Sequence, residues 1–384
     1  YAESAKGSKL YTDKGEYTDW SMGLGPVIKG YAFEDLDKHI NIILKKGIAY
    51  SLPSSYEFEV AKKLIDNLEF GEQVRFARNG SDATSAAVRL ARHITGKNKI
   101  ICNGYHGWQD WYIGATARSY GVPKEVSNLT IKIDAFSIES LELAFSNSED
   151  IACLILEPMI GDEPNNDFLI LARELCNRNK ALLIFDECWT GFRCHKTGAI
   201  GYTGISPDLA CYAKALGNGV PISAVVGNKN LMSGFEEVFF SFTHASDPIG
   251  LAAADFMISY LDSNFYDALT SKTKRIHKRL NKIFSKIKKQ EYRITATSYP
   301  GKIVISVQNQ NFMIQLKTFL QKELLSRNIL FNMFLAVAED HNENDINALL
   351  AGLESAVEKI NNPNFDLDKE TENHLVKAVF RVQK

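Results

Sequence analysis

Residues 181–193 have the sequence Ala-Leu-Leu-Ile-Phe-Asp-Glu-Cys-Trp-Thr-Gly-Phe-Arg, an apolar run followed by a polar, glycine-containing end. The short apolar run predicts a buried strand over 181–186. Asp186 closes this strand, where a charge is costly unless it meets a cation. A protonated ring nitrogen would be such a cation. The stretch therefore predicts a ligand-binding edge at the end of a buried strand.

The surrounding sequence repeats the pattern of a short apolar strand and an amphipathic helix. Further strands are predicted at 74–77, 99–102, 130–133, 151–157, 209–212 and 223–226, with helices at 82–94 and 166–177. This alternation predicts an α/β fold with a large, mostly parallel, seven-stranded sheet sandwiched by helices. In such a sheet the ligand lies at the carboxyl ends of the strands. The residues that follow the predicted strands are thus the first candidates for a site.

The sequence on either side of this segment has a different texture. Lys9–Tyr17 predicts a hairpin with its turn at Lys14-Gly15, and 56–67 has helical periodicity. A strand at 303–307 and helices at 312–327 and 345–360 predict a small α+β domain near the end of the chain. We expect an N-terminal segment (1–60), a large cofactor-binding domain (61–265) and a small C-terminal α+β domain (266–384).

Residues 272–289 form a strongly basic segment that contains nine Lys or Arg. Its apolar residues recur at helical spacing and form one complete stripe: Ile276, Leu280, Ile283 and Ile287. No aromatic platform accompanies the charges. The pattern favours a solvated surface helix whose lysine stems cover apolar surface, with an anion-binding helix as the alternative.

The overall composition is that of a globular chain, with 45% apolar and 23% charged residues in 384. The formal net charge is −2, from 44 basic and 46 acidic residues, so we expect no nucleic-acid or membrane-surface partner. No apolar run reaches the roughly 18 residues of a membrane span. The chain opens without Met or a signal sequence, so we expect a trimmed chain or a fusion to an upstream domain.

The six cysteines are scattered and form no CxxC pair. This pattern favours a reducing, cytoplasmic compartment over a disulfide framework, and it predicts no metal centre. Cys188-x5-Cys194-His195 is the one arrangement in the sequence that resembles a metal cluster. Small core and loop residues are the favoured interpretation of that arrangement.

Two motifs follow the first predicted strands. Asn79-Gly80-Ser81 precedes the helix at 82–94, and free N–H groups with a hydroxyl there can bind a phosphate; a helix cap without ligand is the alternative. Tyr105-His-Gly-Trp-Gln-Asp-Trp111 can supply an aromatic platform for a flat ring, or else an aromatic core cluster.

Two charged residues complete the set of strand-end motifs. Glu157 ends the apolar run from Ile151, and a buried carboxylate must find a partner or line a site. Lys214 lies in an apolar stretch, where a desolvated lysine suits Schiff-base chemistry, whereas an exposed lysine is the alternative. A phosphate cradle, an aromatic stacker, Asp186 and Lys214 together predict pyridoxal phosphate, with the aspartate on the pyridine nitrogen and the lysine on the aldehyde.

The same stretches make the chain resemble the class III, fold-type I pyridoxal-phosphate aminotransferases, and most closely the branch of glutamate-1-semialdehyde 2,1-aminomutase. The similarity covers nearly the whole chain. Its blocks are Arg78–Thr84 with Val88–Arg92, Tyr105–Gly107, Asp186–Arg193, Ser206–Asp208 with Lys214, and Thr243–Pro248.

The resemblance implies a role for each matching residue. Lys214 would hold pyridoxal 5′-phosphate as a Schiff base and shuttle the proton, and Asp186 would keep the ring nitrogen protonated. Tyr105 and Cys188 would contact the two faces of the ring. The remaining cofactor-binding residues would be Asn79, Gly80 and Ser81 at the phosphate, His106 and Glu157 in support, and Thr243 at a neighbouring subunit's phosphate. The role of Thr243 implies a homodimer with shared active sites.

Departures from the family pattern concern the substrate walls. Leu24 stands where the aminomutase has a Trp, Trp108 and Trp111 lie outside the general pattern, and 51–55 also differs. These walls suit a sugar-derived or other polar carbonyl, and the resemblance suggests a link to surface-polysaccharide pathways. Arg193 and Arg118 are candidates for binding a substrate carboxylate, with structural salt bridges as the favoured interpretation.

The sequence thus predicts a cytoplasmic aminotransferase that moves an amino group from a small-molecule donor to a small carbonyl acceptor. An aminomutase, which shifts an amino group within one molecule, is the alternative. A catalytically inactive dimerisation module is a third hypothesis, against which Lys214 and Asp186 argue. The substrate itself is not readable from these residues.

Overall fold

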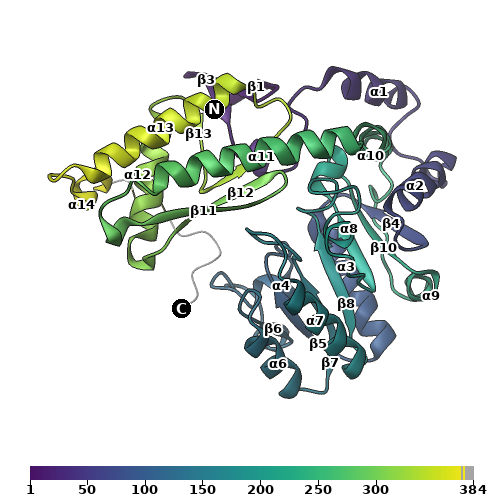
Figure 1. The fold of residues 1–384 in the computed structure, drawn as a ribbon. Coiled ribbons are helices and arrows are strands. Elements are labelled where there is room, and N and C mark those ends of the chain that lie inside the picture. Colours follow the sequence, from purple (N-terminus) through teal and green to yellow (C-terminus); the bar gives the residue numbers. More distant parts are fainter. Residues whose placement is uncertain (373–374, 377–384) are drawn as a thin grey trace. The chain divides into compact units, whose positions relative to one another are not determined.

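The computed structural model describes residues 1–372 and 375–376. Within them the chain divides into two compact units (Figure 1). The terminal unit comprises Tyr1–Glu34, Gly161–Glu163 and the described residues from Ser263 onward, and the central unit comprises Asp35–Ile160 and Pro164–Asp262. No helix of the described part is long and apolar enough to cross a lipid bilayer.

The central unit is built on a seven-stranded sheet. Its strands, in spatial order, are β4 (Gln73–Ala77), β10 (Ser223–Gly227), β9 (Leu209–Tyr212), β8 (Leu182–Glu187), β7 (Ile151–Leu156), β5 (Lys99–Asn103) and β6 (Thr130–Lys132). From β9 to β6 all neighbours are parallel, whereas β10 is antiparallel to both β4 and β9. The predicted α/β fold with a mostly parallel seven-stranded sheet is confirmed, and each predicted strand is present to within a residue or two.

Helices cover both faces of this sheet. The helix α3 (Gly80–Thr95) packs its small residues against one face, in a cluster that contains Ile100, Cys153 and Ile184. Side chains alternate between the faces of a strand, so Leu154 and Leu183 point the other way. The helix α7 (Asn166–Asn179) packs on β7 and β8, and its buried residues are absent from the α3 cluster, which places it on the opposite face. The strand β7 is buried along its whole length as a result.

The other helices of the central unit connect or flank the strands. The α-helices among them are α1 (Glu34–Leu44, which begins at the last residue of the terminal unit), α2 (Ser55–Leu68), α4 (Asp110–Ile113), α5 (Lys124–Ser127), α6 (Ile138–Ser146), α8 (Ala199–Thr203), α9 (Lys229–Met232) and α10 (Pro248–Tyr260). The sequence pattern does not predict α10, because this helix is apolar nearly all round and has no amphipathic period. It is buried on most sides, as such a helix must be.

The terminal unit contains two further sheets. The first joins β1 (Ala2–Lys6), β2 (Lys9–Thr12), β3 (Gly15–Asp19) and β13 (Ile329–Leu330), and the second joins β11 (Ile294–Tyr299), β12 (Lys302–Val307) and β14 (Phe334–Ala336). Its long helices are α11 (Ser263–Phe284), α12 (Met313–Leu325) and α13 (Glu343–Asn361), and the short α14 (Leu367–Thr371) follows. Tyr1–Glu34 thus shares a unit with residues more than two hundred positions later.

The hairpin β2–β3 turns one residue earlier than predicted. Its turn is Asp13-Lys14, because Thr12 and Gly15 are paired across the strands. The Thr12 hydroxyl donates to the Gly15 carbonyl and accepts from the Lys14 N–H, which stabilises this shorter turn.

The basic segment lies on α11, which begins at Ser263 and ends at Phe284. The stripe Ile276, Leu280, Ile283 and Ile287 is buried, although Ile287 falls beyond the helix. Several of the basic side chains pair with α13: Arg275 with Glu343, Arg279 with Asn347 and Lys286 with Glu354. Most of the segment is therefore a surface helix with a buried apolar stripe, and several of its basic side chains bond to polar side chains of α13.

Candidate active site

The candidate site begins where β8 and β9 end together in the central unit. These parallel strands pair Asp186 with Cys211 and Glu187 with Tyr212. Lys214 follows two residues after Tyr212, at the start of a short 3-10 helix, and has a left-handed φ of 45°. The register therefore brings the predicted aspartate and lysine to the same edge of the sheet.

Asp186 is 3% exposed and is held as a carboxylate by its neighbours. His106 lies with Nδ1 2.8 Å from one carboxylate oxygen, and the Cys188 N–H donates to the other at 3.0 Å. Burial by itself would raise the pKa of Asp186, but the hydrogen bonds from His106 and Cys188 and the positive charge of Lys214 lower it below its usual value. A buried carboxylate of this kind suits a cationic partner.

His106 supports Asp186 through both of its ring nitrogens. Its Nε2 is 3.1 Å from the carbonyl oxygen of Asn103, which can only accept a hydrogen bond. Both ring nitrogens are therefore engaged, one with the Asp186 carboxylate and the other with a backbone carbonyl, which fixes the orientation of the ring. Trp111 stacks parallel to it at 6.0 Å, so the ring is also fixed from the side.

The start of α3 forms a cradle of hydrogen-bond donors. In the described chain, the N–H groups of Gly80 and Ser81 and the Ser81 hydroxyl have no hydrogen-bond partner. Asn79 precedes them and is fixed by Asp82, whose carboxylate accepts from its backbone and side-chain N–H groups at 2.9 and 3.0 Å. A phosphate fits such a helix N-terminus with a free hydroxyl.

Two glycines leave this cradle open. A Cβ on Gly80 would lie 2.8 Å from Cys188 Sγ, and a Cβ on Gly107 would lie 2.4 Å from Ser81 Cβ. Both distances are shorter than side chains tolerate. The starts of α3 and of the segment after β8 therefore approach each other because Gly80 has no side chain.

The aromatic segment 105–111 is divided between site and core. Tyr105 is 37% exposed, and its peptide N–H donates to Glu157 Oε1 at 2.7 Å, so Tyr105 and Glu157 adjoin. Trp111 is buried and donates its indole N–H to Ser85. Trp108 is 67% exposed. Tyr105 is thus the aromatic residue of this segment that is partly exposed and also bonded to a buried residue of the site.

Lys214 adjoins a residue to which the sequence pattern gives no role. Its Nζ lies 4.8 Å from the ring centroid of Trp189 and has no hydrogen-bond or ion-pair partner in the described residues. Trp189 belongs to the stretch 181–193, three residues after Asp186. Its position just past the end of a buried strand is the sequence signal that could have identified it.

Three other predicted residues lie apart or inside. Thr243 is exposed in the loop before α10, and no hydrogen bond among the described residues joins it to another predicted site residue. Arg193 is fully buried, and Arg118 is exposed. A fully buried Arg193 fits a structural role rather than the capture of a substrate carboxylate.

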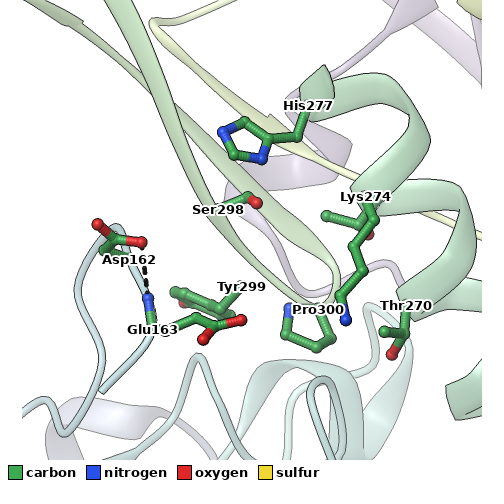
Figure 2. Close-up of a pocket in the computed structure, with 9 residues that line it drawn as sticks. Asp162, Glu163, Thr270, Lys274, His277, Ser298, Tyr299 and Pro300 are labelled. Carbon is green, nitrogen blue, oxygen red and sulfur yellow. Dashed lines mark hydrogen bonds between the residues drawn. The ribbon is translucent and has the colours of Figure 1, made fainter. Parts of the chain in front are cut away.

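A polar pocket of about 210 Å³ lies within the terminal unit and is lined by none of the predicted site residues. Figure 2 shows Asp162 and Glu163 on one side of it and residues of α11, among them Lys274 and His277, on the other. The Glu163 N–H donates to Asp162 at 2.9 Å. Among the residues that the structure describes, no cluster of three or more His, Cys, Asp or Glu could hold a metal ion.

The residues of the central unit fit pyridoxal phosphate. The free donors at the start of α3 suit its phosphate, the carboxylate of Asp186 suits its protonated ring nitrogen, and the amine of Lys214 is available for its aldehyde. The close approach at Gly80 matches a cradle that a side chain would fill.

Comparison with known proteins gives one family and many relatives. The model of the family "Aminotransferase class-III" matches residues 1–322. A glutamate-1-semialdehyde 2,1-aminomutase of Methanococcus maripaludis is 36% identical in an alignment over 292 residues, and the match covers 71% of this chain and 68% of that protein.

Solved structures share the fold at lower identity. An omega-transaminase from Sphaerobacter thermophilus has a TM-score of 0.85 and 20% identity, covering 94% of this chain and 91% of that one. A transaminase described with bound PLP has a TM-score of 0.84 and 21% identity, with the same coverage.

Proposed function

This chain belongs to the class-III aminotransferases, and we propose that it moves an amino group from an amino donor to a small carbonyl substrate through Lys214. It is a pyridoxal-phosphate enzyme, either a transaminase or an aminomutase. The observation that carries the proposal is the Lys214 amine, which lies at the end of β9 beside buried Asp186 without a hydrogen-bond partner in the described chain.

Bound pyridoxal phosphate supplies an electron sink for the substrate carbon that loses its proton. Lys214 Nζ would take up and release that proton, because its amine has no hydrogen-bond or ion-pair partner in the described chain and follows a rigid strand end. Asp186 would keep the ring nitrogen protonated, and His106 holds Asp186 ionised and oriented.

The rest of the site holds and orients. Gly80 and Ser81, with Asn79 before them, would bind the phosphate through the free donors of α3. Tyr105 and Cys188 would contact the two faces of the ring, and Glu157 fixes the backbone of Tyr105. A site fixed by backbone and buried partners keeps the reacting groups in place during turnover.

Replacement of the lysine tests this proposal. Lys214→Ala should bind the cofactor yet lose the visible absorbance of the lysine-bound form and all amino transfer in a screen of donors and carbonyl acceptors. Lys278→Ala, which changes an exposed lysine of α11, is the matched control and should keep wild-type activity. Amino transfer by Lys214→Ala at the wild-type rate would refute the assignment.

An aminomutase activity is the second candidate, and the names of the aminomutase relatives favour it. A mutase turns over one substrate without an external keto acid, whereas a transaminase stops after one half-reaction. Turnover of a single amino-aldehyde with no acceptor present would therefore favour the mutase. Transamination stays first because the resemblance puts Leu24, which is 60% exposed, where that branch has a Trp.

We further propose that the carbonyl substrate is polar and sugar-derived. Three departures from the aminomutase pattern support this idea: Leu24, the exposed Trp108 and the differing stretch 51–55. A comparison of keto-sugar and aliphatic keto-acid acceptors tests it. Equal rates with both classes would remove the preference.

We also propose a cytoplasmic homodimer. Six large apolar side chains are exposed between α1 and the start of α2: Ile42, Leu44, Ile48, Tyr50, Leu52 and Phe58. A concentration of exposed apolar residues is typical of an interface. The exposed Thr243 would then be free to reach the partner's phosphate, and sedimentation of the purified protein tests the dimer.

A further inference from the structure

Trp189 and Lys214 hold equivalent places on neighbouring strands. β8 and β9 pair Glu187 with Tyr212, Trp189 follows the first by two residues, and Lys214 follows the second by two. Both side chains therefore leave the sheet at the same edge, one strand apart. This register alone places an indole beside the lysine.

The turn that carries Trp189 is packed against the end of β9. It closes with a hydrogen bond from the Gly191 N–H to the Glu187 carbonyl at 2.7 Å. A Cβ on Gly191 would lie 2.4 Å from the ring of Tyr212, so only glycine permits this approach. The position of Trp189 relative to Lys214 is thus fixed by the backbone.

The ring of Trp189 is in contact with two cations. The Lys214 ammonium lies 4.8 Å from its centroid, and the guanidinium carbon of Arg193 lies 5.5 Å from it. Arg193 is fully buried, so it packs the ring in place. Tryptophan is the strongest cation–π partner, and an ammonium within about 6 Å of its centroid is attracted to it.

We infer that Trp189 is a positioning residue that holds the free amine of Lys214 whenever the lysine is not bound to the cofactor; this rests on the proposed role of Lys214. Once an amino donor has displaced it, Lys214 has no hydrogen-bond or ion-pair partner in the described chain to keep it near the reacting carbons. The indole face supplies that partner without competing for a proton, since a ring face neither donates nor accepts one.

The reactivity of Lys214 tests this inference. The full chain is loaded with pyridoxamine 5′-phosphate, in which the lysine is free, and trace-labelled with acetic anhydride at pH 8. Mass spectrometry gives the labelling of Lys214 relative to exposed Lys278. Lys214 should be labelled roughly 2- to 30-fold faster in Trp189→Leu than in the wild type. The rate in Trp189→Phe should lie between these two, because phenylalanine is a weaker cation–π partner than tryptophan and leucine is none.

Tyr120→Leu is the control, because Tyr120 is an aromatic residue that is 92% exposed and its substitution should leave the ratio unchanged. If Trp189→Leu does not fold, the comparison of Trp189→Phe with wild type remains. A Lys214 ratio equal to wild type in folded Trp189 variants would overturn the inference. The same labelling without cofactor separates the two proposals, since faster labelling there supports the contact even if no amino transfer is found.

Discussion

At the scale of single residues, the candidate site depends on positions where a side chain is missing or a charge is buried. Gly80 leaves open the helix start that would receive the phosphate, and its neighbour across the gap is Cys188. Glu187, next to Asp186, is a buried carboxylate that the proposed chemistry does not use. These two residues yield predictions that are independent of the substrate.

Gly80→Ala should lower both stability and affinity for pyridoxal phosphate. The added Cβ would lie 2.8 Å from Cys188 Sγ, and overpacking of this kind costs about 1–3 kcal/mol. Cys188→Ala in the same chain removes that sulfur and should restore much of the loss. A double-mutant cycle on the unfolding free energy and on cofactor titration measures the coupling. Additive effects would show that the two residues do not meet.

Glu187→Gln should change how stability depends on pH. Burial raises the pKa of Glu187 to about 7, although Thr190 and the N–H groups of Ala199 and Ile200 donate to it and oppose the shift. A raised pKa means that the protonated form is favoured on folding, so its contribution is full below about 4.5 and is lost as pH rises through 7.

The wild-type melting temperature should therefore fall relative to that of Glu187→Gln between pH 5 and pH 8. The measurement is thermal unfolding of both proteins across this range. Parallel curves for the two proteins would contradict the prediction.

At the scale of elements, apolar stripes and strand registers matter more than surface charge. The helix α11 has both a buried stripe and a row of charge pairs to α13. The exposed pairs should contribute little to stability, because solvent screens their charges. The stripe should contribute more, because its apolar surface is removed from water.

Leu280→Ala should therefore destabilise the terminal unit by about 2–5 kcal/mol, the usual cost of a cavity at a fully buried leucine. Lys286→Ala, which breaks the pair with Glu354, should leave the unfolding midpoint nearly unchanged. Chemical denaturation of both variants makes the comparison. A loss in Lys286→Ala as large as that in Leu280→Ala would show that the charge row governs docking.

At the scale of the whole molecule, the first residues of the chain complete a unit made mostly of its last third. The strand β3 pairs in parallel with β13 through Thr18 and Ile329. The Ser8 hydroxyl and the Lys9 ammonium bind buried Asp345 at 2.7 and 2.8 Å. The structure divides into two compact units, and the division of the sequence into three domains remains a prediction.

Deletion of residues 1–19 should destabilise the terminal unit selectively. It leaves the edge of β13 unpaired and removes the Ser8 and Lys9 partners of the buried Asp345 carboxylate. Limited proteolysis should cut faster between 329 and 345, with little change in 73–227. Deletion of residues 1–6, which removes only the outer strand β1, is the control and should be cut at the wild-type rate.

The sequence by itself determined the local elements and their chemistry. Short apolar runs marked each strand of the large sheet, and Asp186 and Lys214 stood out as charges at the ends of such runs. These signals are local, because burial of a strand requires apolar residues within that strand.

Only the tertiary structure decided which of these ends meet. The register of β8 with β9 brings Trp189 close to Lys214, and the missing side chain of Gly80 lets the start of α3 approach Cys188. It also joined the first strands of the chain to β13. Such contacts depend on strand pairing between distant segments, and no local pattern in one segment records the register of its partner.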